Sequence, residues 1–230
     1  MSELVAAFLA CYLLAGDLLY DPTGMYDRQE IEGWTIYVNP RLPQADGALC
    51  ARTLEVLAAK LLDIARVVPE PALAKLRAIP IWVEHADPRH PCMCYHVSRD
   101  WLVENGFNPE KEGAVEIANA GNFLRWTLDQ PWMVLHELAH GYHHQVITYG
   151  NEALEQAFEH ATEGGRYESV LRFSGQVERH YALNNATEYF AEGTEAFFGT
   201  NDFYPFVNAE LRQHDPELYD LLGDLWGADP

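Results

Sequence analysis

Two histidines and a glutamate in the stretch His136-Glu137-Leu138-Ala139-His140 are the residues best suited to chemistry. On a helix, residues four apart project from the same face, so the two imidazoles can bind one metal ion. Glu137 then lies beside the ion, where its carboxylate can take a proton from water. Apolar neighbours on both sides indicate a buried helix, which disfavours the alternative of two exposed histidines on an amphipathic surface. The pentad therefore predicts a catalytic zinc site.

A catalytic zinc ion needs a third protein ligand and an open fourth position. The extended three-histidine motif fails, because position 146 is Val146. We expect His143 and His144 to be partly exposed or to support the ligands. Glu188 and Glu192 are better candidates, since they lie four residues apart on a second predicted helix. One of them can bind zinc while the other orients a ligating histidine, and two solvated carboxylates are the alternative.

Taken together, these motifs resemble the gluzincins, the zinc peptidases whose third ligand is a glutamate on a later helix. More narrowly, the chain is similar to the catalytic domain of anthrax toxin lethal factor over roughly residues 114–200. The likeness rests on the pentad, on Glu188-Tyr189-Phe190-Ala191-Glu192, and on a tyrosine, Tyr181, seven residues before Glu188.

The resemblance implies one bound Zn²⁺ ion and a role for each matched residue. The implied metal ligands are His136, His140 and Glu188. Glu137 is the implied general base, Glu192 supports a ligating histidine, and Tyr181 steadies the negative charge on the tetrahedral intermediate. The alternative for Tyr181 is an aromatic residue of the core.

In zincins, the strand before the active-site helix is usually a sheet edge that pairs with the extended backbone of the substrate. The residues that match this strand here are Val115, Glu116, Ile117, Ala118 and Asn119. We expect Glu116 either to favour a basic substrate residue or to protect the exposed edge against aggregation.

The pattern of apolar residues and turn signals predicts an α+β fold of the zincin-like metallopeptidase type, in one domain over residues 1–230. A mixed sheet with helices comes first, with strands expected at 34–38, 79–84 and 114–119 and helices at 47–68 and 98–104. Residues 85–94, with two prolines, are expected to form a loop. A mainly helical half follows, with helices expected at 131–149, 151–163, 186–198, 205–213 and 216–226.

The chain is strongly acidic, with 35 acidic against 15 basic residues and a formal charge of −20. Phosphate backbones and anionic membrane surfaces repel such a chain, so we expect no nucleic-acid partner. The four cysteines are Cys11, Cys50, Cys92 and Cys94. We expect free, buried thiols, and pairing of Cys50 with Cys92 or Cys94 is the alternative.

The N-terminal residues 4–15 are apolar and have the length of a signal-peptide core, but Glu3 stands where a positive charge is usual. Residues 1–16 are therefore either a signal-like segment or a buried helix. They are too short to span a bilayer, and no other stretch is suited to it, so we expect no membrane insertion. We expect an extracytoplasmic or secreted protein, with the cytoplasm as the alternative.

The function that these features predict is hydrolysis of peptide bonds by a zinc-dependent endopeptidase, with a peptide or protein as substrate. Two other functions fit the same residues: a catalytically inactive zincin-fold module that binds metal or peptide, and a zinc hydrolase of a non-peptide amide.

Overall fold

The computed structural model describes residues 19–228. The apolar stretch predicted at residues 4–15 and Cys11 lie outside these residues. None of the described helices is long and apolar enough to cross a bilayer.

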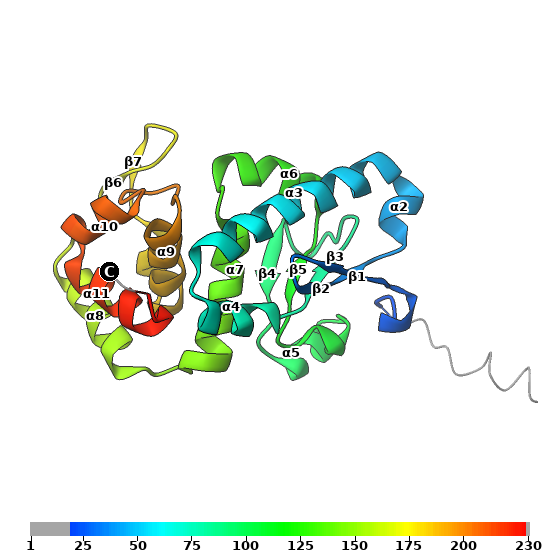
Figure 1. Ribbon diagram of the computed structural model, residues 1–230, viewed down its shortest axis with the longest axis horizontal. Helices are drawn as coiled ribbons and strands as arrows, with labels where there is room; N and C mark the ends of the chain where they lie inside the picture. The colour runs from blue at the N-terminus through cyan, green and yellow to red at the C-terminus, as the bar shows by residue number, and fades with distance from the viewer. Residues whose placement is uncertain (1–18, 229–230) are drawn as a thin grey trace, which may run out of the picture.

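A mixed five-stranded sheet forms the centre of the first half of the chain (Figure 1). Its order is β1-β2-β3-β5-β4, in which β2, β3 and β5 are parallel and the two outer strands are antiparallel to their neighbours. The strands are β1 (Asp27–Ile31), β2 (Trp34–Val38), β3 (Ile81–Val83), β4 (Met93–Tyr95) and β5 (Val115–Ile117).

The inner position of β5 corrects one prediction. The strand was expected at a sheet edge, free to pair with substrate, but β3 and β4 hydrogen-bond to its two sides. Glu116 is therefore fully buried and faces neither substrate nor solvent. The free edge on this side of the sheet belongs to β4, within the segment expected to be a loop.

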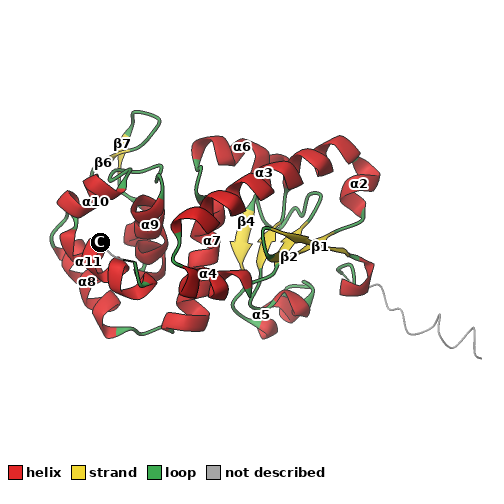
Figure 2. Cartoon of the chain, viewed as in Figure 1, coloured by secondary structure: helices red, strands yellow, loops and turns green. Residues whose placement is uncertain are grey.

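Helices surround the sheet and continue the chain toward the second half (Figure 2). They are α2 (Arg41–Ala45), α3 (Gly47–Val67), α4 (Glu70–Arg77), α5 (Arg99–Glu104), α6 (Ala120–Asp129) and α7 (Met133–Tyr142), with 3₁₀ turns at Thr23–Met25 and Pro109–Lys111. The sequence explains the bounds of α3, because the Asp46 side chain accepts a hydrogen bond from the Leu49 N–H and Pro69 follows its end. Its residues Leu57, Leu61 and Ile64 recur at helical spacing and are buried.

Helix α7 carries the pentad and packs closely against the sheet. A Cβ on Gly141 would lie 2.6 Å from Ile79 Cδ1, so this contact needs a glycine. The predicted helix 131–149 is regular only to Tyr142, and a π-helical turn (His143–Ile147) continues it to Thr148, whose φ is +68°.

The second half is almost entirely helical and lies at the opposite end of the molecule from β1 (Figures 1 and 2). Its elements are α8 (Glu152–Glu163), the hairpin β6 (Val170–Leu171) and β7 (Val177–Glu178), a 3₁₀ turn (Tyr181–Asn184), α9 (Ala186–Phe198), α10 (Asn208–His214) and α11 (Pro216–Trp226). Helix α9 is enclosed by α7 and by the helices that follow it, so its residues from Tyr189 to Phe197 are buried.

The predicted α+β fold, with a mixed sheet first and a mainly helical half after it, is confirmed. One cluster of buried apolar side chains runs through both halves, from Ile36 in the sheet through Leu135 to Phe190 and Leu222. Cys50, Cys92 and Cys94 are free thiols, as expected.

Candidate metal centre

Helices α7 and α9 bring three side chains together: His136, His140 and Glu188. His136 Nε2 lies 3.1 Å from His140 Nε2 and 3.1 Å from Glu188 Oε2, and His140 Nε2 lies 3.3 Å from the same oxygen. A tetrahedral zinc ion with bonds of about 2.0–2.1 Å holds nitrogen and oxygen ligands about 3.3 Å apart. The three atoms thus have the mutual spacing that one zinc ion requires, and all three residues were predicted from sequence.

The position of Glu188 follows from the way α9 begins. Asn185 caps the helix by accepting a hydrogen bond from the Glu188 N–H, at 2.9 Å, which puts Glu188 in the first turn. Burial acts to raise the pKa of Glu188, but hydrogen bonds from His136 and His140 outweigh it and hold that pKa at about 2. The carboxylate is therefore ionised, as a metal ligand must be.

A second carboxylate supports His136 from behind, and it is Glu195 rather than the predicted Glu192. His136 Nδ1 lies 2.8 Å from Glu195 Oε1, whereas the closest Glu192 oxygen is 3.6 Å away. Glu192 instead accepts a hydrogen bond from Asn201 Nδ2 at 2.8 Å. The sequence contained the signal, because positions 188, 192 and 195 are spaced four and then three residues apart and lie along one helix face.

The centre brings three buried or half-buried carboxyl groups together without a lysine or an arginine of residues 19–228 paired with them. Among the described residues, Glu188, Glu192 and Glu195 form ion pairs with histidines and with no lysine or arginine. Burial, and then the neighbouring Glu195, raise the pKa of Glu192 to about 8, and burial also raises the pKa of Glu195. A cation bound between the two helices would lower both pKa values and favour the ionised carboxylates.

A cavity of about 560 Å³ opens beside the centre. His136, Glu137 and Tyr181 line it, and so does Met93 of β4. Burial, and then the charge of Glu188, raise the pKa of Tyr181, so its hydroxyl keeps its proton and can donate it in a hydrogen bond. The predicted base and the predicted hydroxyl donor thus face one cavity together with His136, a candidate metal ligand.

The two histidines after the pentad lie outside this group. His143 is 1% exposed, and neither of its ring nitrogens has a hydrogen-bond partner among the described residues, which corrects the expectation of a partly exposed side chain. Burial lowers the pKa of His143 to about 4, so the ring is neutral and packs against Tyr149 and Phe190. His144 Nδ1 lies 2.9 Å from the Tyr95 hydroxyl oxygen.

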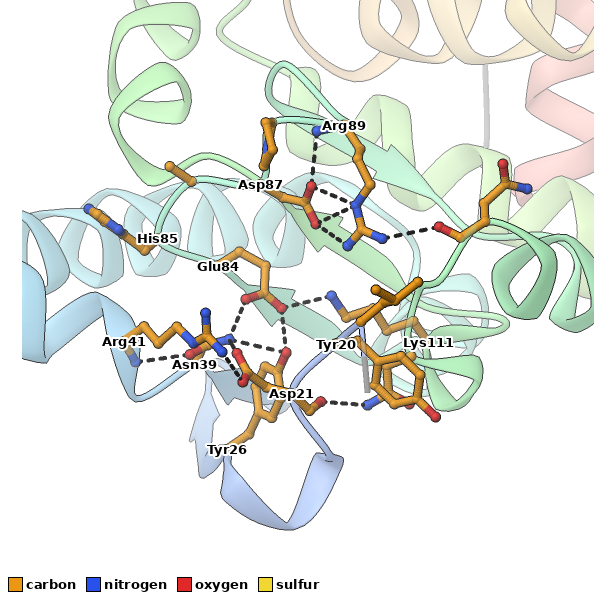
Figure 3. A pocket seen from close by; sticks show the side chains of 15 residues that line it. Tyr20, Asp21, Tyr26, Asn39, Arg41, Glu84, His85, Asp87, Arg89 and Lys111 are labelled. Atoms are coloured by element: carbon orange, nitrogen blue, oxygen red, sulfur yellow. Dashed lines mark hydrogen bonds and ion pairs between the residues drawn. The ribbon is translucent and has the colours of Figure 1, made fainter. Parts of the chain in front are cut away.

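A second, more polar cavity of about 620 Å³ lies between the sheet and the segment before β1 (Figure 3). Its charged side chains pair with each other: Arg41 with Asp21, Arg89 with Asp87, and Lys111 with Glu84. Tyr26 and Asn39 also donate hydrogen bonds to Glu84, each at 2.6 Å. Because these groups satisfy one another, the lining leaves little unpaired charge to bind a ligand.

Comparison with known proteins adds one distant likeness. No protein-family model and no curated protein matches the sequence. Among solved structures, the PRO-PRO endopeptidase (PPEP-2) from Paenibacillus alvei aligns over 74% of this chain and 89% of that chain, with 17% sequence identity and a TM-score of 0.39. A TM-score of this size does not establish a shared fold, so the function has to be argued from the site itself.

Proposed function

We propose that this protein is a zinc-dependent endopeptidase of the gluzincin type, with His136, His140 and Glu188 as the metal ligands. The observation that carries the proposal is the convergence of three ligand atoms, 3.1–3.3 Å apart, next to a cavity that Glu137 and Tyr181 also line. A zinc ion held by these residues would act as a Lewis acid: it would polarise the substrate carbonyl and lower the pKa of bound water to about 7.

Each protein group then has a distinct task. The Glu137 carboxylate accepts a proton from the attacking water and delivers it to the leaving amine. The Tyr181 hydroxyl donates a hydrogen bond to the negative charge that develops on the carbonyl oxygen. Glu195 accepts the Nδ1–H of His136, which fixes the tautomer that leaves Nε2 free to bind metal.

We propose β4 as the strand that binds substrate. It is the free edge of the sheet on this side, and its residue Met93 lines the cavity next to His136 and Glu137. An extended peptide that pairs with β4 gains main-chain hydrogen bonds whatever its sequence, while the cavity receives one of its side chains. A peptide or protein substrate is therefore favoured over a small amide, which would use neither feature.

The test compares wild type with Glu137→Gln on casein and on a peptide library, with the zinc content of both measured. We expect both to bind zinc and the variant to be slower by roughly 10²–10⁴-fold, because a positioned general base contributes about that much. Glu155→Gln, on the exposed face of α8, is the matched control and should be fully active. Zinc binding with equal inactivity of wild type and Glu137→Gln on every peptide would overturn the proposal in favour of a binding module.

A further inference from the structure

Three more potential metal ligands gather on the opposite face of the sheet from α7. Side chains alternate along a strand, so Met93 and Tyr95 of β4 face α7 while Cys94 and His96 face the other way. His90, from the loop before β4, joins them, and one ligand atom from each of His90, Cys94 and His96 lies within 4.8 Å of the other two.

The spacing between two of these atoms fits a common ion. Cys94 Sγ lies 3.6 Å from His96 Nε2. A tetrahedral zinc ion with a sulfur ligand at about 2.3 Å and a nitrogen ligand at about 2.0–2.1 Å separates the two by about 3.6 Å. A hydrogen bond between the Cys94 sulfur and the His96 ring accounts for the same distance, so a second observation is needed to favour a metal ion.

The His90 side chain favours a metal ion. Its Nε2 atom is shielded from solvent and has no hydrogen-bond partner in the part of the chain that the structure describes. A buried polar atom without a partner costs roughly 1–3 kcal/mol of stability. A hydrogen bond between Cys94 and His96 does not remove this cost for His90. A metal ion that binds His90 through Nε2, together with Cys94 and His96, would remove it.

We propose that His90, Cys94 and His96 form a second metal site, for a thiophilic divalent cation such as Zn²⁺. A thiolate with two imidazoles suits zinc and excludes Ca²⁺ and Mg²⁺, which take oxygen ligands. This site is independent of the proposed peptidase centre, whose three ligands include no sulfur. Its ion joins the loop that carries His90 to β4 and so holds the edge strand in place.

A carboxylate is at hand for the fourth position. Glu116 on β5 lies directly opposite Cys94, and its Oε2 is 2.5 Å from His96 Nε2. Lys111 Nζ donates a hydrogen bond to the other oxygen of Glu116, Oε1, so Oε2 is the oxygen next to His96. To bind the same ion as His96, Oε2 would move away by about 0.8 Å, to the separation of about 3.3 Å between ligand atoms on tetrahedral zinc.

Cobalt is the probe that separates the two sites. Stripped with a chelator and titrated with Co²⁺, the wild-type protein should bind two equivalents, and one of them should produce the near-ultraviolet charge-transfer band of a thiolate–cobalt bond. Only the second site contains a cysteine, so this band reports on it alone. His140→Ala should lose one equivalent and keep the band, which distinguishes failure of this proposal from failure of the peptidase proposal.

Cys94→Ser should bind one equivalent and lose the band. Cys92→Ser is the matched control, a buried cysteine two residues away that is not part of the group, and it should keep both. If Cys94→Ser does not fold, His90→Gln serves in its place, because His90 is only partly buried, and it should weaken the band. A wild-type protein without the band, or a Cys94→Ser variant that still binds two equivalents, would overturn the proposal.

Discussion

Two buried clusters of carboxylates and histidines, one in the sheet and one between helices, differ in the basic groups that pair with their carboxylates. In the sheet, Glu84 and Glu116 share the ammonium group of Lys111, at 2.7 and 2.5 Å. Between α7 and α9, three carboxylates form ion pairs with histidines and with no other basic side chain among the described residues. The sheet cluster thus contains a lysine that pairs with both of its glutamates, whereas no lysine or arginine among the described residues pairs with the glutamates of the helix cluster.

The pKa values of two equally buried glutamates record this difference. Burial acts to raise the pKa of Glu116, but the hydrogen bond from His96 and the charge of Lys111 outweigh it and keep that pKa below its usual value. For Glu192, burial and the neighbouring Glu195 act in the same direction and raise the pKa to about 8. Burial alone therefore does not decide whether a carboxylate is charged, and the nearby cation does.

The largest effect should come from removing the cation of the sheet cluster. Lys111→Met leaves Glu84 and Glu116 buried without a cation between them, which costs about 3–5 kcal/mol of folding free energy. Urea denaturation monitored by circular dichroism measures the loss, with the exposed Lys75→Met as control. Unfolding midpoints that agree for the two variants would show that Lys111 does not balance this cluster.

The next prediction tests whether the cavity beside the helix cluster is a catalytic site, a role not proposed for the sheet cluster. Tyr181 is 48% exposed. The substitution Tyr181→Phe should lower kcat by roughly 10²–10³-fold, because one hydrogen bond to the developing charge is lost. KM and zinc content should not change. Tyr149→Phe, similarly exposed but outside the cavity, is the control for steady-state kinetics. A kcat that falls equally in both variants would remove Tyr181 from the mechanism.

The smallest effect resolves the roles within the helix cluster. Glu195→Ala removes the acceptor of His136 Nδ1–H and should weaken zinc binding by roughly 10–100-fold. Glu192→Ala leaves that hydrogen bond intact and should weaken binding less. Competition with a chromophoric chelator gives both affinities. The reverse order would favour Glu192, the residue first expected to orient the histidine.

The sequence was most informative where one helix determines the outcome. The pentad needs only the helical repeat to align His136 with His140, and the helix predicted at 186–198 has the bounds of α9. The same repeat also relates Glu188 to Glu195, but nothing local says which of two inward carboxylates reaches a histidine on another helix.

The missed features depend on partners distant in sequence. Strand β4 has three residues and follows a proline-rich loop, so its alternation is too short to detect, and only its pairing with β5 identifies it. The strand 115–119 was expected at the edge because the zincin resemblance places the strand before the active-site helix there, but the unrecognised β4 takes that position. Glu116 can likewise be buried because Lys111 and His96, which come from other segments, hydrogen-bond to its two carboxylate oxygens.

The distance along the chain between the ligands has a mechanical consequence. His140 and Glu188 are 48 residues apart, and α8 and the hairpin lie between them. An ion that joins the two closes a loop of that length, and for a covalent link of this span chain-entropy models give roughly 4 kcal/mol at 25 °C. The metal would thus act as a removable cross-link, so that chelation lowers the resistance of the α8–hairpin segment to unfolding and to cleavage by an added protease.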